Sequence, residues 1–182
     1  MKKVIVVLSA GFEELEAVTV IDVLRRANIS VEMVGLRDVQ LTGSRGITML
    51  CDEVFDYYSD LDYDGVIMVG GMDNAMNLSQ DEDVLKLLND YMSKGKLVAG
   101  ICATPAIVFS QAGILHGKKV TCYPSDSLVL NLDGDFVDES CVVDDNLITS
   151  QSPDTALEFA LTIINYLGGN ATEVYSELQG KN

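Results

Sequence analysis

Residues 96–109 read Lys96-Leu-Val-Ala-Gly-Ile-Cys-Ala-Thr-Pro-Ala-Ile-Val-Phe109, a pattern that predicts a buried strand running directly into a helix. Cys102 falls at the turn between them, and Pro105 suits the first turn of a helix, where its missing N–H is not needed. Such a turn lifts its side chain clear of the sheet, and the N–H groups that begin the helix favour negative charge there. The Cys102 thiol is therefore expected to ionise below the usual pKa of ~8.5. From this stretch alone, a buried structural cysteine is an equally good interpretation.

Strands and helices alternate on both sides of this stretch. Apolar or alternating runs predict strands, and amphipathic patterns predict helices. The expected strands cover 3–9, 31–36, 64–71, 119–123 and two segments within 135–149. The expected helices cover 14–28, 81–94, the segment from the Cys102 turn to 111, 153–167 and 171–178. A small excursion or hairpin is expected near 46–51. The two segments within 135–149 are joined at Asp144-Asp145-Asn146, which indicates an antiparallel hairpin. This order of elements predicts an α/β fold in which helices cover both faces of a mostly parallel sheet.

The composition indicates a globular protein with a single domain that spans residues 1–182. Of the 182 residues, 48% are hydrophobic, which is enough for a core that needs no disulfides or metal. Twelve basic and 28 acidic residues give a formal net charge of −16, so nucleic acid and anionic membrane surfaces are not expected as partners. The apolar run at residues 4–8 is too short for a signal peptide and is interpreted as a first strand, so we expect a cytoplasmic protein.

The cysteines give no sign of a metal site or a disulfide framework. Cys51, Cys102, Cys122 and Cys141 are widely spaced without a C-x-x-C motif, and the chain has a single histidine. No metal and no cofactor are therefore expected. Cys51, Cys122 and Cys141 are interpreted as ordinary strand or loop cysteines.

Glu16 has an unusual place in the predicted helix 14–28. It shares one helical face with Val20, Val23 and Ala27, so it heads an apolar stripe. A carboxyl group in that place would be partly desolvated, which raises its pKa. Its neighbours Glu13 and Glu14 are instead interpreted as charges that complement the positive end of the helix dipole.

Three features of the sequence are expected to meet at the carboxyl ends of the parallel strands, where ligands bind in such sheets. They are the loop that carries Glu16, the glycine pair Gly70-Gly71 and the Cys102 turn. A plain tight turn is the alternative interpretation of the glycine pair. Together, these features favour a functional cysteine over a structural one.

Two other kinds of site are excluded by the same residues. A nucleotide site is rejected because loop 9–16 lacks the small residues that cradle phosphate and carries three carboxylates. A serine-hydrolase turn is rejected because it would need serine at Cys102 and glycine at Thr104. The remaining interpretation is a thiolate site in which the N–H groups of Gly71 and Ala103 form an oxyanion hole.

Several of these motifs resemble one known family. They are Gly11-Phe-Glu-Glu-Leu-Glu-Ala-Val-Thr-Val-Ile-Asp-Val-Leu-Arg-Arg-Ala27, Val69-Gly-Gly71, Gly100-Ile-Cys-Ala-Thr-Pro105 and Leu147-Ile-Thr-Ser-Gln-Ser-Pro-Asp-Thr-Ala-Leu-Glu-Phe-Ala160. In this order they closely resemble the ThiJ/PfpI superfamily, specifically its DJ-1 branch, over nearly the whole chain. The resemblance implies a flavodoxin-like, class I glutamine amidotransferase-like three-layer α/β/α sandwich, usually assembled as a homodimer.

The resemblance also implies roles for individual residues. The family's oxidation-sensitive nucleophile falls on Cys102, and the carboxyl group that donates a hydrogen bond to the thiolate falls on Glu16. The oxyanion amides fall on Gly71 and Ala103. Relatives in the DJ-1 branch are associated with glyoxalase or deglycase activity on methylglyoxal and its adducts, with peroxide sensing through a cysteine sulfinate, and with chaperone-like behaviour.

The chain departs from the family at one position. Active relatives carry a histidine beside the cysteine where this chain has Tyr123, and the only histidine, His116, is expected in a surface turn. Peptidase and amidotransferase activities are therefore not expected, because a Cys–His pair is missing. Two hypotheses stay open: a Cys102/Glu16 catalyst acting on a small carbonyl compound, or a redox sensor or chaperone that reacts with peroxide. Loss of the histidine favours the second, and the Cys102–Glu16 pair permits either.

Overall fold

The structure is a computed structural model that describes residues 1–55 and 63–181. A seven-stranded sheet forms the middle layer, in the order β10-β11-β7-β6-β1-β2-β5. Its strands are β1 (Lys3–Leu8), β2 (Ser30–Gly35), β5 (Glu53–Val54), β6 (Gly65–Met68), β7 (Leu97–Ile101), β10 (Cys141–Asp144) and β11 (Leu147–Ser150). All neighbouring strands are parallel except β10 and β11, which form the expected antiparallel hairpin. The prediction of a mostly parallel α/β sheet is confirmed.

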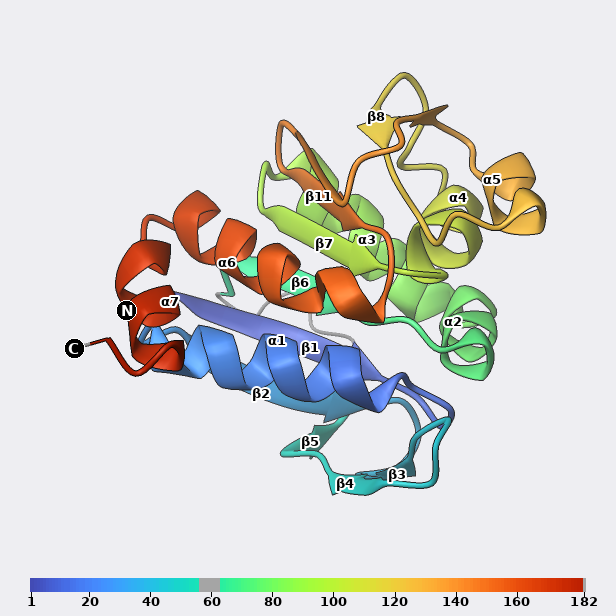
Figure 1. Ribbon diagram of the computed structural model, residues 1–182. Coiled ribbons are helices and arrows are strands. Elements are labelled where there is room, and N and C mark those ends of the chain that lie inside the picture. Colours follow the sequence, from blue (N-terminus) through green and yellow to red (C-terminus); the bar gives the residue numbers. More distant parts are fainter. Residues whose placement is uncertain (56–62, 182) are drawn as a thin grey trace.

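Helices cover both faces of the sheet (Figure 1). One face carries α1 (Glu14–Arg26), α6 (Ala156–Tyr166) and α7 (Ala171–Leu178). The other carries α2 (Met72–Ser79), α3 (Glu82–Ser93), the π-helix Pro105–Phe109, α4 (Ser110–Ala112) and α5 (Asp126–Asn131). The result is the three-layer α/β/α sandwich that the sequence predicted.

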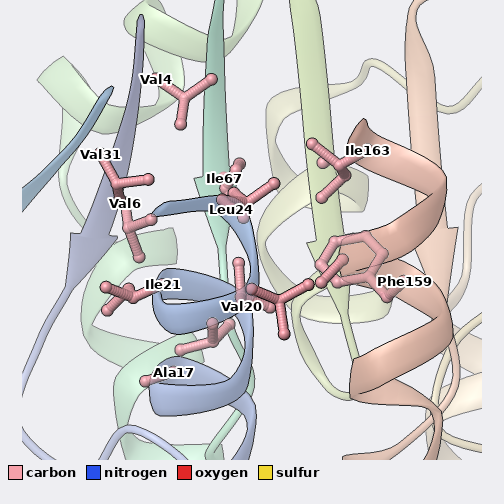
Figure 2. Packing of buried hydrophobic residues seen from close by; sticks show 14 of the residues in the cluster. Val4, Val6, Ala17, Val20, Ile21, Leu24, Val31, Ile67, Phe159 and Ile163 are labelled. Atoms are coloured by element: carbon pink, nitrogen blue, oxygen red, sulfur yellow. The ribbon is translucent and has the colours of Figure 1, made fainter. Parts of the chain in front are cut away.

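The central strand β1 explains why both faces need helices. Residues 4–8 are completely buried, and successive side chains of a strand point to opposite faces. Val4 and Val6 pack in the core on the side of α1 and α6, which Figure 2 shows close up. Ile5 and Val7 pack in the core on the side of α2 and α3. A strand that is apolar at every position is therefore stable only between two helical layers.

Two smaller pairs of strands lie outside the main sheet. The hairpin expected near 46–51 is formed by β3 (Gln40–Thr42) and β4 (Thr48–Leu50). The strand expected over 119–123 is shorter, because β8 (Lys119–Val120) ends before the site and pairs with β9 (Asp135–Phe136).

The structure corrects the predicted helices in several places. Helices α2 and α5 were not predicted. The first helix ends at Arg26 instead of residue 28, where Asn28 has a φ of 57°. The helix after the Cys102 turn begins as a π-helix at Pro105, and α6 is preceded by a short 3₁₀ turn at Pro153–Thr155. Within the described ranges, every helix is too short or too polar to cross a membrane.

Candidate active site

Cys102 lies directly after β7, at the carboxyl end of the sheet. Its φ of 65° is in the left-handed region, which a non-glycine residue adopts only at a cost. The surrounding backbone holds it there: the Cys102 N–H donates to the carbonyl of Ser150 at 2.9 Å, and its carbonyl accepts from the Tyr123 N–H at 2.9 Å. The strand–turn–helix geometry expected from the sequence is present, and the turn is strained.

Glu16 lies beside this thiol, on the first turn of α1. It is completely buried. The Gly70 N–H donates to its Oε2 at 2.6 Å, whereas Oε1 has no hydrogen-bond partner in the described part of the chain. Burial raises the pKa of Glu16 to about 7, although hydrogen bonds from Gly70 and with the Cys102 thiol oppose this rise. The apolar-stripe position predicted for Glu16, with its raised pKa, is therefore correct.

The direction predicted for the Cys102 pKa is wrong. Burial, followed by the charge and hydrogen bond of Glu16, raises the pKa of the thiol. The N–H groups of Ala103 and Gly71 act in the opposite direction. The local turn supplies only the N–H groups, which lower the pKa of the thiol. The burial of the thiol and the adjacent carboxyl group of Glu16, which raise it, come from the tertiary structure. A proton on Glu16 removes its repulsion of a thiolate, so the two groups are suited to share one negative charge.

The glycine pair makes room for this arrangement. A Cβ atom on Gly70 would lie 2.6 Å from Cys102 Cβ and 2.8 Å from Glu16 Oε2. Gly71 has a φ of 92°, and a Cβ atom there would lie 2.1 Å from the carbonyl oxygen of Gly11. Neither position accepts a side chain without displacing its neighbours, so the pair serves the close approach of the backbone to the thiol and is more than a tight turn.

Asn74 is a buried polar residue that sequence reasoning missed. Its Nδ2 donates to the carbonyls of Val69 and Gly70 at 2.9 and 3.1 Å. Its Oδ1 accepts from the Ser9 N–H at 2.6 Å. One fully buried side chain thus ties the loop after β1 to the loop after β6. No sequence signal pointed to it, because α2 was not predicted.

Glu14 does more than complement the helix dipole. Its side chain is buried and accepts from the N–H groups of Arg45 and Ile47 at 2.6 and 3.2 Å, and from the Ser44 hydroxyl at 3.2 Å. Burial raises its pKa, but these hydrogen bonds outweigh burial and the pKa is lowered. The interpretation of Glu14 as only a helix-terminal charge is therefore wrong. Its neighbour Glu13 is partly exposed and accepts from the Ser44 hydroxyl at 3.2 Å.

A cavity of about 410 Å³ opens above the thiol. Its lining includes Cys102, Gly71 and Ala103 from the site and Glu13, Arg45 and Tyr123 around them. Tyr123 is 43% exposed. A second cavity of about 480 Å³ beside α5 is lined by Pro124, Val129, Leu130 and Phe136 with two aspartates, and no thiol, hydroxyl or imidazole is among the described residues that line it.

The remaining predicted residues lie away from this chemistry. His116 is exposed in a turn, as expected. Burial raises the pKa of Cys51, Cys122 and Cys141 to about 11 each, and none of the three lines the cavity above Cys102. Within residues 1–55 and 63–181, no three His, Cys, Asp or Glu side chains gather in a way that could hold a metal ion.

Comparison with known proteins places this geometry in a family. The model of the DJ-1/PfpI family matches residues 2–166. The chain belongs to this family. The protein dj-1beta of Drosophila melanogaster is 38% identical over 170 residues, which cover 92% of this chain and 90% of that protein. The Parkinson disease protein 7 homolog of Danio rerio is 35% identical over 172 residues, with the same coverage. The chain spans only 38% and 43% of two longer relatives, the DJ-1 homologs B and A of Arabidopsis thaliana.

Solved structures of DJ-1 proteins have the same fold. The crystal structure of Drosophila melanogaster DJ-1beta superimposes with a TM-score of 0.93 at 36% identity, covering 98% of this chain and 97% of that one. Oxidized Toxoplasma gondii DJ-1 superimposes with a TM-score of 0.92 at 31% identity, covering 98% of both chains. Both comparisons support the DJ-1 branch of the family.

Proposed function

We propose that this DJ-1 family member is a stress-response protein that acts as a cofactor-independent glyoxalase, or as a deglycase on the corresponding adducts. The substrate is methylglyoxal or a similar small dicarbonyl. One observation carries the proposal: a fully buried carboxyl group with a pKa of about 7 lies against a thiol at a strained turn. A pKa close to the working pH suits a group that both accepts and returns a proton.

The first half of the reaction is the addition of Cys102 to the aldehyde carbon. The thiol proton passes to Glu16, the sulfur–carbon bond forms, and the aldehyde oxygen becomes negatively charged. The N–H groups of Gly71 and Ala103, which already act on the sulfur, would donate to that oxygen. Protonation of the oxygen gives a hemithioacetal.

Glu16 then moves a proton between neighbouring carbons. As a carboxylate it removes the proton from the former aldehyde carbon, and it returns a proton to the adjacent ketone carbon, while the hydroxyl proton of the first carbon passes to the oxygen of the second. The aldehyde carbon is oxidised to a thioester and the ketone carbon is reduced to an alcohol, so no external oxidant is needed. Water cleaves the thioester, which releases lactate and regenerates the Cys102 thiol.

A redox sensor is the second candidate, and Tyr123 favours it because the histidine of active relatives is absent. In that role, Cys102 reduces two molecules of peroxide to water and becomes a sulfinate. A protonated Glu16 and the N–H groups of Gly71 and Ala103 would hold the sulfinate oxygens. A chaperone role for the protein stays open beside it.

Lactate production from methylglyoxal separates the two candidates. The proposal expects turnover by the wild type and none by Cys102→Ala. Cys51→Ala is the matched control, because it removes a buried thiol that lies outside the cavity. Peroxide titration followed by intact mass gives the sensor readout. A wild-type protein that forms a sulfinate but no lactate is a sensor, and the glyoxalase proposal then fails.

We further propose that the protein is a cytoplasmic homodimer. The family resemblance is the main support, and Leu15 and Val18 add to it as exposed apolar residues at successive turns of α1, at 55% and 50% exposure. The four cysteines are free thiols, which suits a reducing compartment. Light scattering that gives the 19.7 kDa mass of one chain at micromolar concentration would exclude the dimer.

A further inference from the structure

We infer that the cavity above Cys102 selects dicarbonyl substrates with a negatively charged tail, a carboxylate, and that Arg45 binds this tail. The inference rests on the proposed function and names its substrate class. Arg45 is the one cationic side chain among the described residues that line the cavity. It forms no ion pair with any acidic side chain in residues 1–55 and 63–181.

The size of the cavity leaves room for a tail. Methylglyoxal has five non-hydrogen atoms, which at the volume of liquid water, about 30 Å³ per oxygen, would occupy roughly 150 Å³. The cavity measures about 410 Å³. A three-carbon dicarbonyl bound at Cys102 would therefore leave more than half of the space unfilled.

The position of Arg45 is fixed by a buried carboxylate. Glu14 accepts the Arg45 N–H at 2.6 Å, the Ile47 N–H at 3.2 Å and the Ser44 hydroxyl at 3.2 Å, so the loop on both sides of Arg45 is anchored to α1. Gly43 begins this loop without a side chain, because a Cβ atom there would lie 2.4 Å from Glu14 Cδ. The loop between β3 and β4 is thus tied to the rim of the cavity at the residue that carries the positive charge.

The electrostatic setting of the cavity favours an anion. The residues that line it include the N-terminal boundaries of two helices, Glu13 of α1 and Gly71 of α2, whose positive dipole ends face this region. Among the described residues that line the cavity, Glu13 alone carries a carboxylate, and it accepts a hydrogen bond from Ser44. Because the chain carries a net charge of −16, an anion needs a local cation to approach the thiol, and Arg45 supplies it.

The reaction itself stays the same for such a substrate. A suitable compound is 4,5-dioxopentanoate, a 2-oxoaldehyde with a carboxylate at the far end. Cys102 adds to its aldehyde, Glu16 transfers the proton between the two carbonyl carbons, and water releases 2-hydroxyglutarate. The aldehyde carbon is oxidised and the ketone carbon is reduced, as with methylglyoxal.

The first test uses two alkylating reagents and needs no turnover. Iodoacetate and iodoacetamide react with the same thiolate and differ by one negative charge, so the ratio of their rates at Cys102 cancels any change in thiolate population. Arg45→Met is expected to lower this ratio about fivefold to tenfold, the scale of a unit charge at the mouth of a partly solvated cavity. Arg45→Lys is expected to retain most of the wild-type ratio of the two rates. The rates are followed by mass spectrometry of the Cys102 peptide.

Lys94→Met is the matched control for the loss of one positive charge. Lys94 is exposed at the C-terminal end of α3, shortly before the amino end of β7, whereas the thiol follows the carboxyl end of the same strand. Its removal is expected to change the ratio by less than about twofold, because exposed charges beyond the Debye length of ~10 Å are largely screened. An Arg45→Met ratio equal to that of wild type, or a Lys94→Met ratio that falls equally, overturns the role of Arg45.

The second test compares 4,5-dioxopentanoate with 2-oxopentanal, a neutral 2-oxoaldehyde of equal chain length. Wild type is expected to prefer the anion in kcat/KM, and Arg45→Met is expected to lose the preference mainly through KM, because the tail is remote from the reacting carbons. Equal kcat/KM values for the two compounds in wild type overturn the substrate class. If no 2-oxoaldehyde is turned over at all, the proposed function fails, and the alkylation ratio alone decides whether Arg45 attracts anions to Cys102.

Discussion

Glu14 and Glu16 lie two residues apart at the start of α1, and both are buried, yet their surroundings drive their pKa values in opposite directions. Glu14 is surrounded by donors from the 43–47 loop, which favour its charged form. At Glu16, burial outweighs the hydrogen bonds from one backbone N–H and with the Cys102 thiol, so its neutral form is favoured. Burial alone therefore does not decide whether a carboxyl group serves as a structural anchor or as a proton carrier. The number of hydrogen bonds that reach it decides.

The opposite pKa shifts of Glu14 and Glu16 should be visible in the pH dependence of the free energy of unfolding. The pKa of Glu16 is raised from 4.5 to about 7, so between these values the folded state holds a proton that the unfolded state has lost. Stability therefore falls as the pH rises through this window, and Glu16→Gln removes that fall. We expect Glu16→Gln to gain about 3 kcal/mol relative to wild type between about pH 4.5 and pH 8. Urea unfolding at several pH values measures it.

Glu14→Gln provides the opposite case for the same measurement. The pKa of Glu14 is lowered, so its stabilising contribution is present above its unfolded pKa and is lost as the pH falls through its folded pKa. Glu14→Gln should therefore be less stable than wild type at neutral pH, and the difference should shrink in acid. If both variants change with pH in the same direction, the distinction between the two carboxyl groups is wrong.

Catalysis should separate proton transfer from hydrogen bonding at Glu16. The Glu16→Gln side chain keeps a donor for the sulfur but cannot carry a proton, so methylglyoxal turnover is expected to fall by ~10²-fold or more. Peroxide oxidation of Cys102 to the sulfinate should stay near that of wild type. The lactate assay and intact mass measure the two effects on the same sample.

Glu82→Gln is the control for this experiment, because Glu82 is an exposed glutamate at the first turn of α3, another helix. It should leave both readouts unchanged. Should Glu16→Gln behave in the same way, Glu16 is only a helix-terminal charge and the assignment of the site is wrong.

Substitution of Asn74 alters the surroundings of Cys102 without changing Glu14 or Glu16. Asn74→Leu leaves the Ser9 N–H and the carbonyls of Val69 and Gly70 without their partner, which should cost about 2–3 kcal/mol. Cys102 alkylation should also shift to higher pH, because the Gly71 N–H that lowers the thiol pKa follows directly after Gly70.

Asn77→Ala is the matched control for Asn74. Asn77 lies on the same helix, is half-buried and donates to the Ser9 hydroxyl at 3.1 Å. Its loss should cost less than about 1 kcal/mol and leave the pH profile of alkylation in place. A profile unchanged in Asn74→Leu would limit Asn74 to a structural role.

Most of the fold could be predicted from the sequence, because the periodicity of a strand or helix lies within the residues of that element. Helices α2 and α5 were missed because their own residues show too little of this periodicity. Helix α2 buries only Asn74, Ala75 and Leu78 and exposes two methionines, and α5 buries only Leu128, so neither shows a clear apolar stripe.

In the candidate site too, local patterns could be predicted from the sequence and contacts between distant residues could not. Glu16 could be predicted because it heads an apolar stripe within its own helix. The role of Glu14 could not, because its partners are backbone N–H groups about thirty residues away in the chain. The direction of the Cys102 pKa was wrong because its burial and its contact with Glu16 exist only after folding. Local chemistry was therefore predictable, and contacts between distant loops were not.

Gly43 makes room for Glu14, as Gly70 makes room for Glu16 and the thiol. Substitutions of these two glycines therefore test the comparison of the two carboxyl groups with the smallest change in side chain. Gly70→Ala would drive a Cβ atom into Cys102 Cβ, which cannot move away. In Gly43→Ala the clash is with the end of the Glu14 side chain, which can rotate aside and give up its hydrogen bonds to the loop. We therefore expect only about 1–2 kcal/mol of destabilisation for Gly43→Ala, with turnover of methylglyoxal retained.

The decisive readout for Gly43→Ala is the alkylation ratio of iodoacetate to iodoacetamide at Cys102. Once Glu14 releases the loop, Arg45 is no longer held at the rim, so the ratio should fall part of the way toward that of Arg45→Met. Gly113→Ala is the control, because Gly113 has a φ of 70° and open space around it, and its substitution costs backbone strain of ~1 kcal/mol without reaching the cavity. If both glycine variants keep the wild-type ratio, Glu14 stabilises its loop without positioning Arg45, and the anchor and the anion site are independent features.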